Sequence, residues 1–115
     1  MLMHEMSICE SILNVLKKEA RERNFQAVNR VCLEIGPLSG VEVEALRFGF
    51  DVVMKGSLAE GARLDIIETE GTAYCMACEK PVVIAARYEP CPECGSHQLQ
   101  VTGGEELRIK ELEVD

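Results

Sequence analysis

Two Cys-x-x-Cys pairs, a short distance apart, constrain this chain more than any other feature. Cys75 and Cys78 form the first pair and Cys91 and Cys94 the second, with twelve residues between the pairs. Two residues between cysteines let a tight turn direct both sulfurs at one ion, and two such turns make a tetrahedral four-cysteine site. The spacing therefore predicts a structural Zn(II) site with a closed shell and no hydrolytic chemistry.

Other uses of these cysteines fit the spacing less well. A redox Cys-x-x-Cys needs one motif at a helix start in a thioredoxin-like unit, and iron–sulfur clusters usually use different spacings. Disulfides would suit an oxidising compartment, whereas paired motifs favour a metal in a reducing one. His97 lies three residues beyond Cys94 and could replace a thiolate, but four sulfurs already fill the shell, which favours a surface position.

The region before the cysteines alternates between helical and strand patterns. Apolar residues from Met6 to about Asn24 recur at helical spacing, and Ser7 with Glu10 fits a capping box, so an amphipathic helix is expected to begin between residues 4 and 7. Cys9 lies on its apolar face and is expected to be a buried thiol. The burial of Cys32, in the strand that follows, stays open.

That strand is predicted by the period-two pattern of "NRVCLEI", which Gly36 and Pro37 interrupt. Ser39 and Glu42 then suggest a second capping box, and the helix after them would end at Gly56. The apolar face of this helix would carry Val43, Leu46, Phe50 and Val53, and Gly49 would mark a close contact with the sheet.

Further strands are expected in "RLDIIET" and "ELRIKELEV", and a short one at residues 82–84 between the cysteine pairs. In the last strand, a bulge near Lys110 and Glu111 would bring the apolar residues on both sides of it to one face. The fold class is therefore α+β: two helices packed on a small three-stranded sheet, with an inserted zinc-ribbon-like four-cysteine module. Residues 1–71 and 98–115 would form one domain and residues 72–97 the zinc-binding domain.

Composition excludes several classes of partner. Of 115 residues, 47% are hydrophobic and 28% charged, which is typical of a globular protein, and the net charge is −8. Lysine and arginine are scattered, so neither phosphate neutralisation nor nucleic-acid binding is expected. No stretch is long and apolar enough for a membrane span, and the start has neither the basic n-region nor the h-region of a signal peptide. A cytoplasmic protein is expected.

The N-terminal segment "MLMHEMSICE" contains one of the two histidines of the chain, His4. By itself this residue could be a helix-entry residue, a packing residue or a metal ligand. An imidazole together with deprotonated backbone amides gives a square-planar donor set, which favours Ni(II) or Cu(II) over zinc.

A resemblance extends over nearly the whole chain. The segments "MHEMSICESIL", "VCLEIGPLSGVEVEALRFGFD" and "GSLAEGARLDI", followed by the paired cysteines with "CPECGSH", resemble the HypA/HybF hydrogenase nickel-incorporation proteins. The resemblance implies a non-enzymatic nickel metallochaperone that helps deliver Ni(II) to the large subunit of [NiFe]-hydrogenase. It also implies that the protein works with the GTPase HypB. In some bacteria the family also serves urease, which would make urease maturation proteins further partners.

The same resemblance implies the nickel ligands. Met3, His4 and Glu5 correspond to the Met-His-Glu that begins most family members, so that His4 would supply an imidazole nitrogen and Glu5 a backbone nitrogen. The amine of Met3 would be a ligand if the protein begins there. Met1 and Leu2 depart from the family pattern, because a protein that begins at Met1 has its amine displaced from the histidine.

Two other classes of function remain as alternatives. One is a zinc-ribbon interaction module without a nickel role. It would need a basic, aromatic-bearing ribbon face to bind nucleic acid, but residues 72–97 carry only Lys80 and Arg87 against three glutamates. The other is an enzyme, which the closed zinc shell and the lack of a catalytic group beside a histidine argue against.

Overall fold

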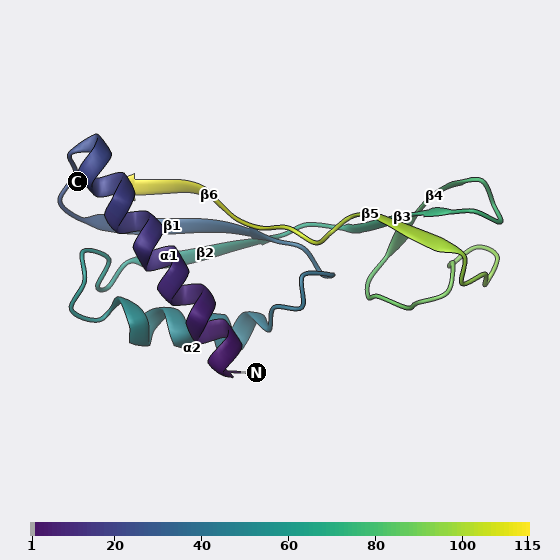
Figure 1. Ribbon diagram of the computed structural model, residues 1–115, viewed down its shortest axis with the longest axis horizontal. Helices are drawn as coiled ribbons and strands as arrows, with labels where there is room; N and C mark the ends of the chain where they lie inside the picture. Colours follow the sequence, from purple (N-terminus) through teal and green to yellow (C-terminus); the bar gives the residue numbers. More distant parts are fainter. Residues whose placement is uncertain (1) are drawn as a thin grey trace. The chain divides into compact units, whose positions relative to one another are not determined.

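The computed structural model describes residues 2–115, with side chains described from His4 onward, and has two helices and six strands in the described part (Figure 1). These residues fall into two compact units. Of the described residues, the first unit comprises residues 2–33, Val41–Asp65 and Ile109–Asp115, and the second comprises Glu34–Gly40 and Ile66–Arg108. The domain boundaries drawn from the sequence, at residues 72 and 97, stay a prediction. Within residues 2–115, neither helix has the length and apolar character that a bilayer crossing requires.

Helix α1 (Leu2–Arg23) and helix α2 (Val43–Met54) pack against each other in the first unit. Gly49 of α2 makes this close approach possible, because a Cβ at its position would lie 3.1 Å from Met6 Sδ and 3.4 Å from Cys9 Sγ. The close contact expected at this glycine therefore exists, but its partner is α1 and not the sheet. Leu46 and Phe50 are buried on the same side of α2, as predicted.

Both predicted helix starts were wrong. Helix α1 already includes residue 2, so that Ser7 and Glu10 lie inside it and do not cap it. Helix α2 has Glu42 as its N-cap, whose carboxylate accepts a hydrogen bond from the Glu44 N–H at 2.9 Å. An N-cap needs only a side-chain acceptor beside the free N–H groups of the first turn, and glutamate supplies one here. The predicted end is confirmed, because Lys55 is the C-cap and Gly56 follows with a φ of 77°.

The first sheet has the strand order β2-β1-β6, with β1 (Val28–Ile35) between β2 (Arg63–Glu68) and β6 (Leu107–Val114). All three strands were predicted, and the α+β fold class is confirmed. On the face of the sheet that carries no helix, the Arg30 guanidinium forms ion pairs with Asp65, Glu111 and Glu113. Cys32 is fully buried, which settles a point that its sequence pattern left open.

The second sheet has the order β4-β3-β5 and contains the cysteine pairs. Strand β3 (Gly71–Cys75) pairs antiparallel with both β4 (Lys80–Ile84) and β5 (Leu99–Gly103). Only β4 was predicted. Strand β5 alternates apolar Leu99 and Val101 with polar residues, a signal that was overlooked, whereas the buried residues of β3 are small and give a weak pattern. Six buried residues form its core: Leu38, Ala73, Cys75, Val82, Ile84 and Cys91.

Gly36 follows β1 at a point where two backbone segments cross at close range. Its N–H donates to the carbonyl of Glu106, and a Cβ on Gly36 would lie 2.0 Å from the carbonyl oxygen of Gly104. The interruption of the strand pattern at this glycine thus has a steric cause.

Replacing Gly36 by alanine is expected to destabilise the protein by about 3 kcal/mol, because the clashing atom belongs to the backbone and cannot rotate away. Gly49→Ala is the matched control. Its nearest neighbours are two flexible or small side chains, and alanine favours the helix by about 1 kcal/mol. Thermal unfolding followed by circular dichroism measures both variants. An unchanged midpoint for Gly36→Ala would contradict the predicted clash.

Candidate metal centre

Four cysteine sulfurs converge at the end of the second sheet. The Sγ atoms of Cys75, Cys78, Cys91 and Cys94 all lie within 4.8 Å of one another. The Cys75–Cys94 distance is 3.7 Å and the Cys78–Cys91 distance is 3.9 Å. A disulfide would require about 2.05 Å between sulfurs. Four ligands placed tetrahedrally at about 2.3 Å from an ion lie about 3.8 Å from one another, which matches both distances.

Both cysteine pairs are held by the same backbone turn. In the first, the Glu79 N–H donates to the Cys75 carbonyl at 2.8 Å; in the second, the Gly95 N–H donates to the Cys91 carbonyl at 2.9 Å. The closing residue has a positive φ in each turn, 56° at Glu79 and 78° at Gly95. The two turns are therefore conformational equivalents, although only one of them uses glycine.

Backbone N–H groups also point at the sulfurs. The Cys78 N–H donates to Cys75 Sγ at 3.3 Å, and the Glu93 N–H donates to Cys91 Sγ at 3.4 Å. Burial raises the pKa of the Cys91 thiol, but the N–H groups of Cys94 and Glu93, together with hydrogen bonds to the Cys75 and Cys94 thiols, lower it to about 7. These donors favour the thiolate, which is the form that binds a metal ion. Lys80 forms an ion pair with Glu93 beside the sulfurs.

The remaining cysteines and His97 stand apart from this cluster. His97 is exposed and is not part of the four-sulfur group, in agreement with the surface position predicted for it. Cys9 is fully buried and directs its thiol at the Leu46 carbonyl at 3.5 Å. Burial raises the pKa of the Cys9 thiol to about 11, so this residue is a packing thiol and not a nucleophile.

The N-terminal residues singled out from the sequence lie in the first turn of α1. His4 is exposed, whereas Glu5 is completely buried. One carboxylate oxygen of Glu5 accepts a hydrogen bond from the Glu42 N–H at 3.0 Å, at the start of α2. The N–H of Glu42 is the main reason why the pKa of Glu5 lies below its usual value. The other oxygen, Oε1, has no hydrogen-bond partner within the described residues.

This side-chain role of Glu5 was not anticipated. From the sequence, only the backbone nitrogen of Glu5 was considered. The one signal for its side chain was the presence of a carboxylate on the otherwise apolar face of the helix. The carboxylate ties the first turn of α1 to the N-terminus of α2, where a negative charge is favourable. The backbone beside His4 is thereby anchored while its imidazole stays in solvent.

The fold and the four-thiol cluster define a small α+β metal-binding protein with a knuckle-type cysteine site. A family model described as hydrogenase/urease nickel incorporation, metallochaperone, hypA matches residues 3–114. The chain therefore belongs to the HypA family of nickel-incorporation metallochaperones, which act in hydrogenase maturation.

Individual relatives agree with this assignment. Over 113 residues the chain is 61% identical to the hydrogenase maturation factor HypA 2 of Bradyrhizobium diazoefficiens, and 57% identical to the HypA of Azotobacter vinelandii. Each alignment covers 98% of this chain and 100% of the relative. The solution structure of the Ni metallochaperone HypA from Helicobacter pylori is similar with a TM-score of 0.68, at 26% identity, over 96% of both chains.

Replacing Cys78 by serine is expected to remove at least tenfold of the metal affinity of the cluster, because a hydroxyl does not replace a soft thiolate ligand. The matched control is Cys9→Ala, which removes a buried thiol of the first unit and should leave the metal content unchanged. Metal analysis of the purified variants, with a competing chelator, measures the difference. Equal retention of metal by Cys78→Ser would contradict a four-sulfur site.

Proposed function

We propose that this protein carries Ni(II) at its N-terminal segment and passes it to the large subunit of [NiFe]-hydrogenase during maturation. The observation that carries the proposal is the position of His4. Its imidazole is exposed in the first turn of α1, in a chain that belongs to a nickel-incorporation family. An accessible site at a chain end allows both acquisition and release of a cargo ion.

Backbone nitrogens complete the proposed donor set. The first four N–H groups of an α-helix have no acceptor within the helix, and α1 begins at Leu2, so the His4 N–H belongs to this class and the Glu5 N–H comes directly after it. When deprotonated, they and the imidazole would provide the nitrogen ligands of a square-planar nickel site. The helical first turn must open for successive amide nitrogens to reach one ion in a plane.

The amine of Met3 is the fourth ligand that we propose, for a protein that begins at this residue. Support comes from the alignments, since the family model starts at residue 3 and the full length of the relatives is matched by 113 residues of the chain. In this scheme the carboxylate of Glu5 does not need to bind nickel. It holds the turn against α2 through the Glu42 N–H, while its backbone nitrogen serves the ion.

For the four-cysteine cluster we propose Zn(II) in a structural role. The sulfur–sulfur distances of 3.7 and 3.9 Å fit tetrahedral zinc, and four thiolates leave no position for water or substrate. The second unit has a core of six small or medium side chains, two of which are themselves cysteine ligands, so the ion would supply much of its stability. A protein of this kind needs no catalytic centre, and we propose that it is not an enzyme.

The partners follow from the family role. We propose the GTPase HypB, the hydrogenase large subunit and, where urease is present, its maturation proteins. None of the six cysteines forms a disulfide, which suits the reducing cytoplasm that we propose as the location of the protein.

Replacing His4 by alanine is expected to abolish roughly stoichiometric Ni(II) binding, while zinc content and circular dichroism stay unchanged. His97→Ala is the matched control, because it removes the only other histidine, which lies in the second unit. Isothermal titration with Ni(II) measures both variants, and in the parent protein the affinity should fall with falling pH as protons compete for the nitrogens. Nickel binding retained by His4→Ala would refute the proposed site.

Protein that begins at Met3 is expected to bind Ni(II) more tightly than protein that begins at Met1, by at least tenfold, because only the shorter form has its amine next to His4. Mass spectrometry establishes the first residue of each preparation, and nickel titration compares them. Equal affinities would exclude the Met3 amine as a ligand but would leave the role of His4 to the preceding test.

A further inference from the structure

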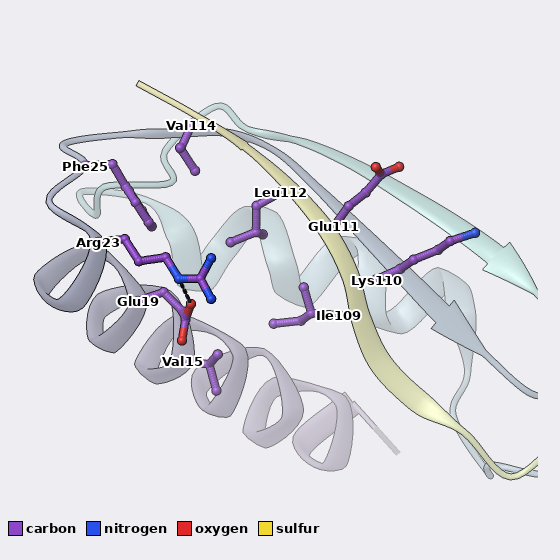
Figure 2. A pocket seen from close by; sticks show the side chains of 9 residues that line it. All are labelled: Val15, Glu19, Arg23, Phe25, Ile109, Lys110, Glu111, Leu112 and Val114. Atoms are coloured by element: carbon purple, nitrogen blue, oxygen red, sulfur yellow. Dashed lines mark ion pairs between the residues drawn. The ribbon is translucent and has the colours of Figure 1, made fainter.

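Strand β6 lies at an edge of the first sheet, and its outer side pairs with no described strand. A groove of about 530 Å³ runs along this edge between β6 and α1. Its apolar lining comes from both elements and from the loop that follows α1, namely Val15, Phe25, Ile109, Leu112 and Val114 (Figure 2). Val15 and Val114 are 45% and 40% exposed, so the groove leaves apolar surface in contact with water.

The side chains of β6 point to two opposite faces of the sheet. Figure 2 shows Ile109 and Leu112 directed toward α1, and Lys110 and Glu111 directed away from it. Because Lys110 and Glu111 are consecutive and lie on the same face, the alternation of side chains between the two faces of the strand changes phase between them. This agrees with the bulge predicted from the sequence. The contacts of Arg30 with both Glu111 and Glu113 fit the same change. The apolar residues of both halves of β6 therefore share one face.

The order of charges along β6 is self-complementary. From Leu107 to Val114 the strand reads apolar, positive, apolar, positive, negative, apolar, negative, apolar. Read backwards, every positive residue falls opposite a negative one and every apolar residue opposite an apolar one. In an antiparallel pair of identical strands the facing residues would be Arg108 with Glu113, Ile109 with Leu112, and Lys110 with Glu111.

We propose that two copies of this chain associate through their β6 edges, antiparallel, with the two-fold axis at the Lys110–Glu111 step. Opposite charges that face each other across a strand pair stabilise it, and backbone hydrogen bonds join the two edges into one six-stranded sheet. The axis coincides with the change of phase, so that the apolar residues of both copies lie on the same face of the joined sheet.

This arrangement also accounts for the groove. In the joined sheet, Ile109 and Leu112 of the second copy lie on the same face as α1 of the first copy. The α1 helix of the second copy, with Val15, lies on that face as well. The exposed apolar side chains of one copy are then covered by those of the other. The occupant of the groove is thus a second copy of the chain, and the interface is isologous.

Charged residues on an edge strand often prevent pairing with another strand. Whether they do so in β6 depends on which charges face each other in each register. Lys110 has no ion-pair partner among the described residues, and Arg108 remains 68% exposed although it pairs with Glu34. In-register parallel pairing would set every charge opposite the same charge of the other copy, whereas the antiparallel register sets opposite charges against each other. Glu111, Glu113 and Arg108 already have ion-pair partners within the chain, so Lys110 is the charge that gains its first partner in the dimer. The charges therefore select one register instead of blocking every one. The net charge of −8 on each copy opposes association at long range, which predicts a concentration-dependent dimer.

The test uses full-length, metal-loaded protein in analytical ultracentrifugation over a range from low micromolar to millimolar concentration. Wild-type protein is expected to dimerise. Lys110→Glu should weaken the dimer by about tenfold or more, because one substitution sets like charges against each other at two symmetric contacts. Lys55→Glu, at the exposed end of α2, changes the net charge equally and should dimerise as the wild type does.

A mixture identifies the register. Glu111→Lys alone should weaken the dimer to a similar extent, but an equimolar mixture of Lys110→Glu with Glu111→Lys should form a heterodimer, since both contacts at the axis again join opposite charges. Circular dichroism and metal content verify that each variant is folded. Independently of any variant, hydrogen exchange at the β6 amides should slow as the wild-type concentration rises.

Three results would overturn the proposal. These are a wild-type protein that stays monomeric throughout the range, a Lys110→Glu variant that dimerises as tightly as the Lys55→Glu control, and folded charge variants that do not associate when mixed. Concentration-independent exchange at the β6 amides would overturn it as well, even if either variant failed to fold.

Discussion

The convergence of four cysteine sulfurs is the constraint on which the second unit depends. The four cysteines lie in two turns that are separated in the sequence. Their sulfurs meet only because β3 pairs with both β4 and β5. The core beneath them consists of a few small side chains, two of them cysteines, which is little hydrophobic surface for an independent fold. A metal ion held by the four thiolates, as proposed for this site, would join the two turns and so compensate for the small core.

The first unit depends on a different kind of contact. Its two helices approach closely at Gly49, and the buried carboxylate of Glu5 joins the start of α1 to the start of α2. Burying a carboxylate is costly unless a donor accompanies it, and the free N–H groups of a helix N-terminus are suitable donors. The result is a first turn of α1 whose backbone is anchored through Glu5, while the side chain of the preceding residue, His4, is exposed. This combination suits the nickel site proposed at His4, because a cargo site has to be both defined and accessible.

Much of this protein could be predicted because its strongest signals are local. The cysteine spacing requires two tight turns, and the periods of the apolar residues identified both helices and all strands of the first sheet. Helix starts could not be read in the same way. Ser7 and Ser39 fit a capping pattern, yet α1 extends to residue 2 and α2 uses Glu42, because packing between the helices determines which residues enter the first turn. Strand β5 carries a period-two pattern that was overlooked, whereas β3 buries only the small residues Gly71, Ala73 and Cys75, whose pattern is weak.

By itself, the sequence determined that the chain has a four-cysteine site, two amphipathic helices and a short sheet, and its motifs indicated the HypA family. These properties depend on residue type and spacing, which the chain contains explicitly. The tertiary structure decided which residues meet across long separations. It buried Cys32, placed Gly49 against α1, gave the carboxylate of Glu5 its donor at Glu42, and left β6 at an open edge. Such contacts join segments tens of residues apart, and no local pattern specifies which segments will pack together.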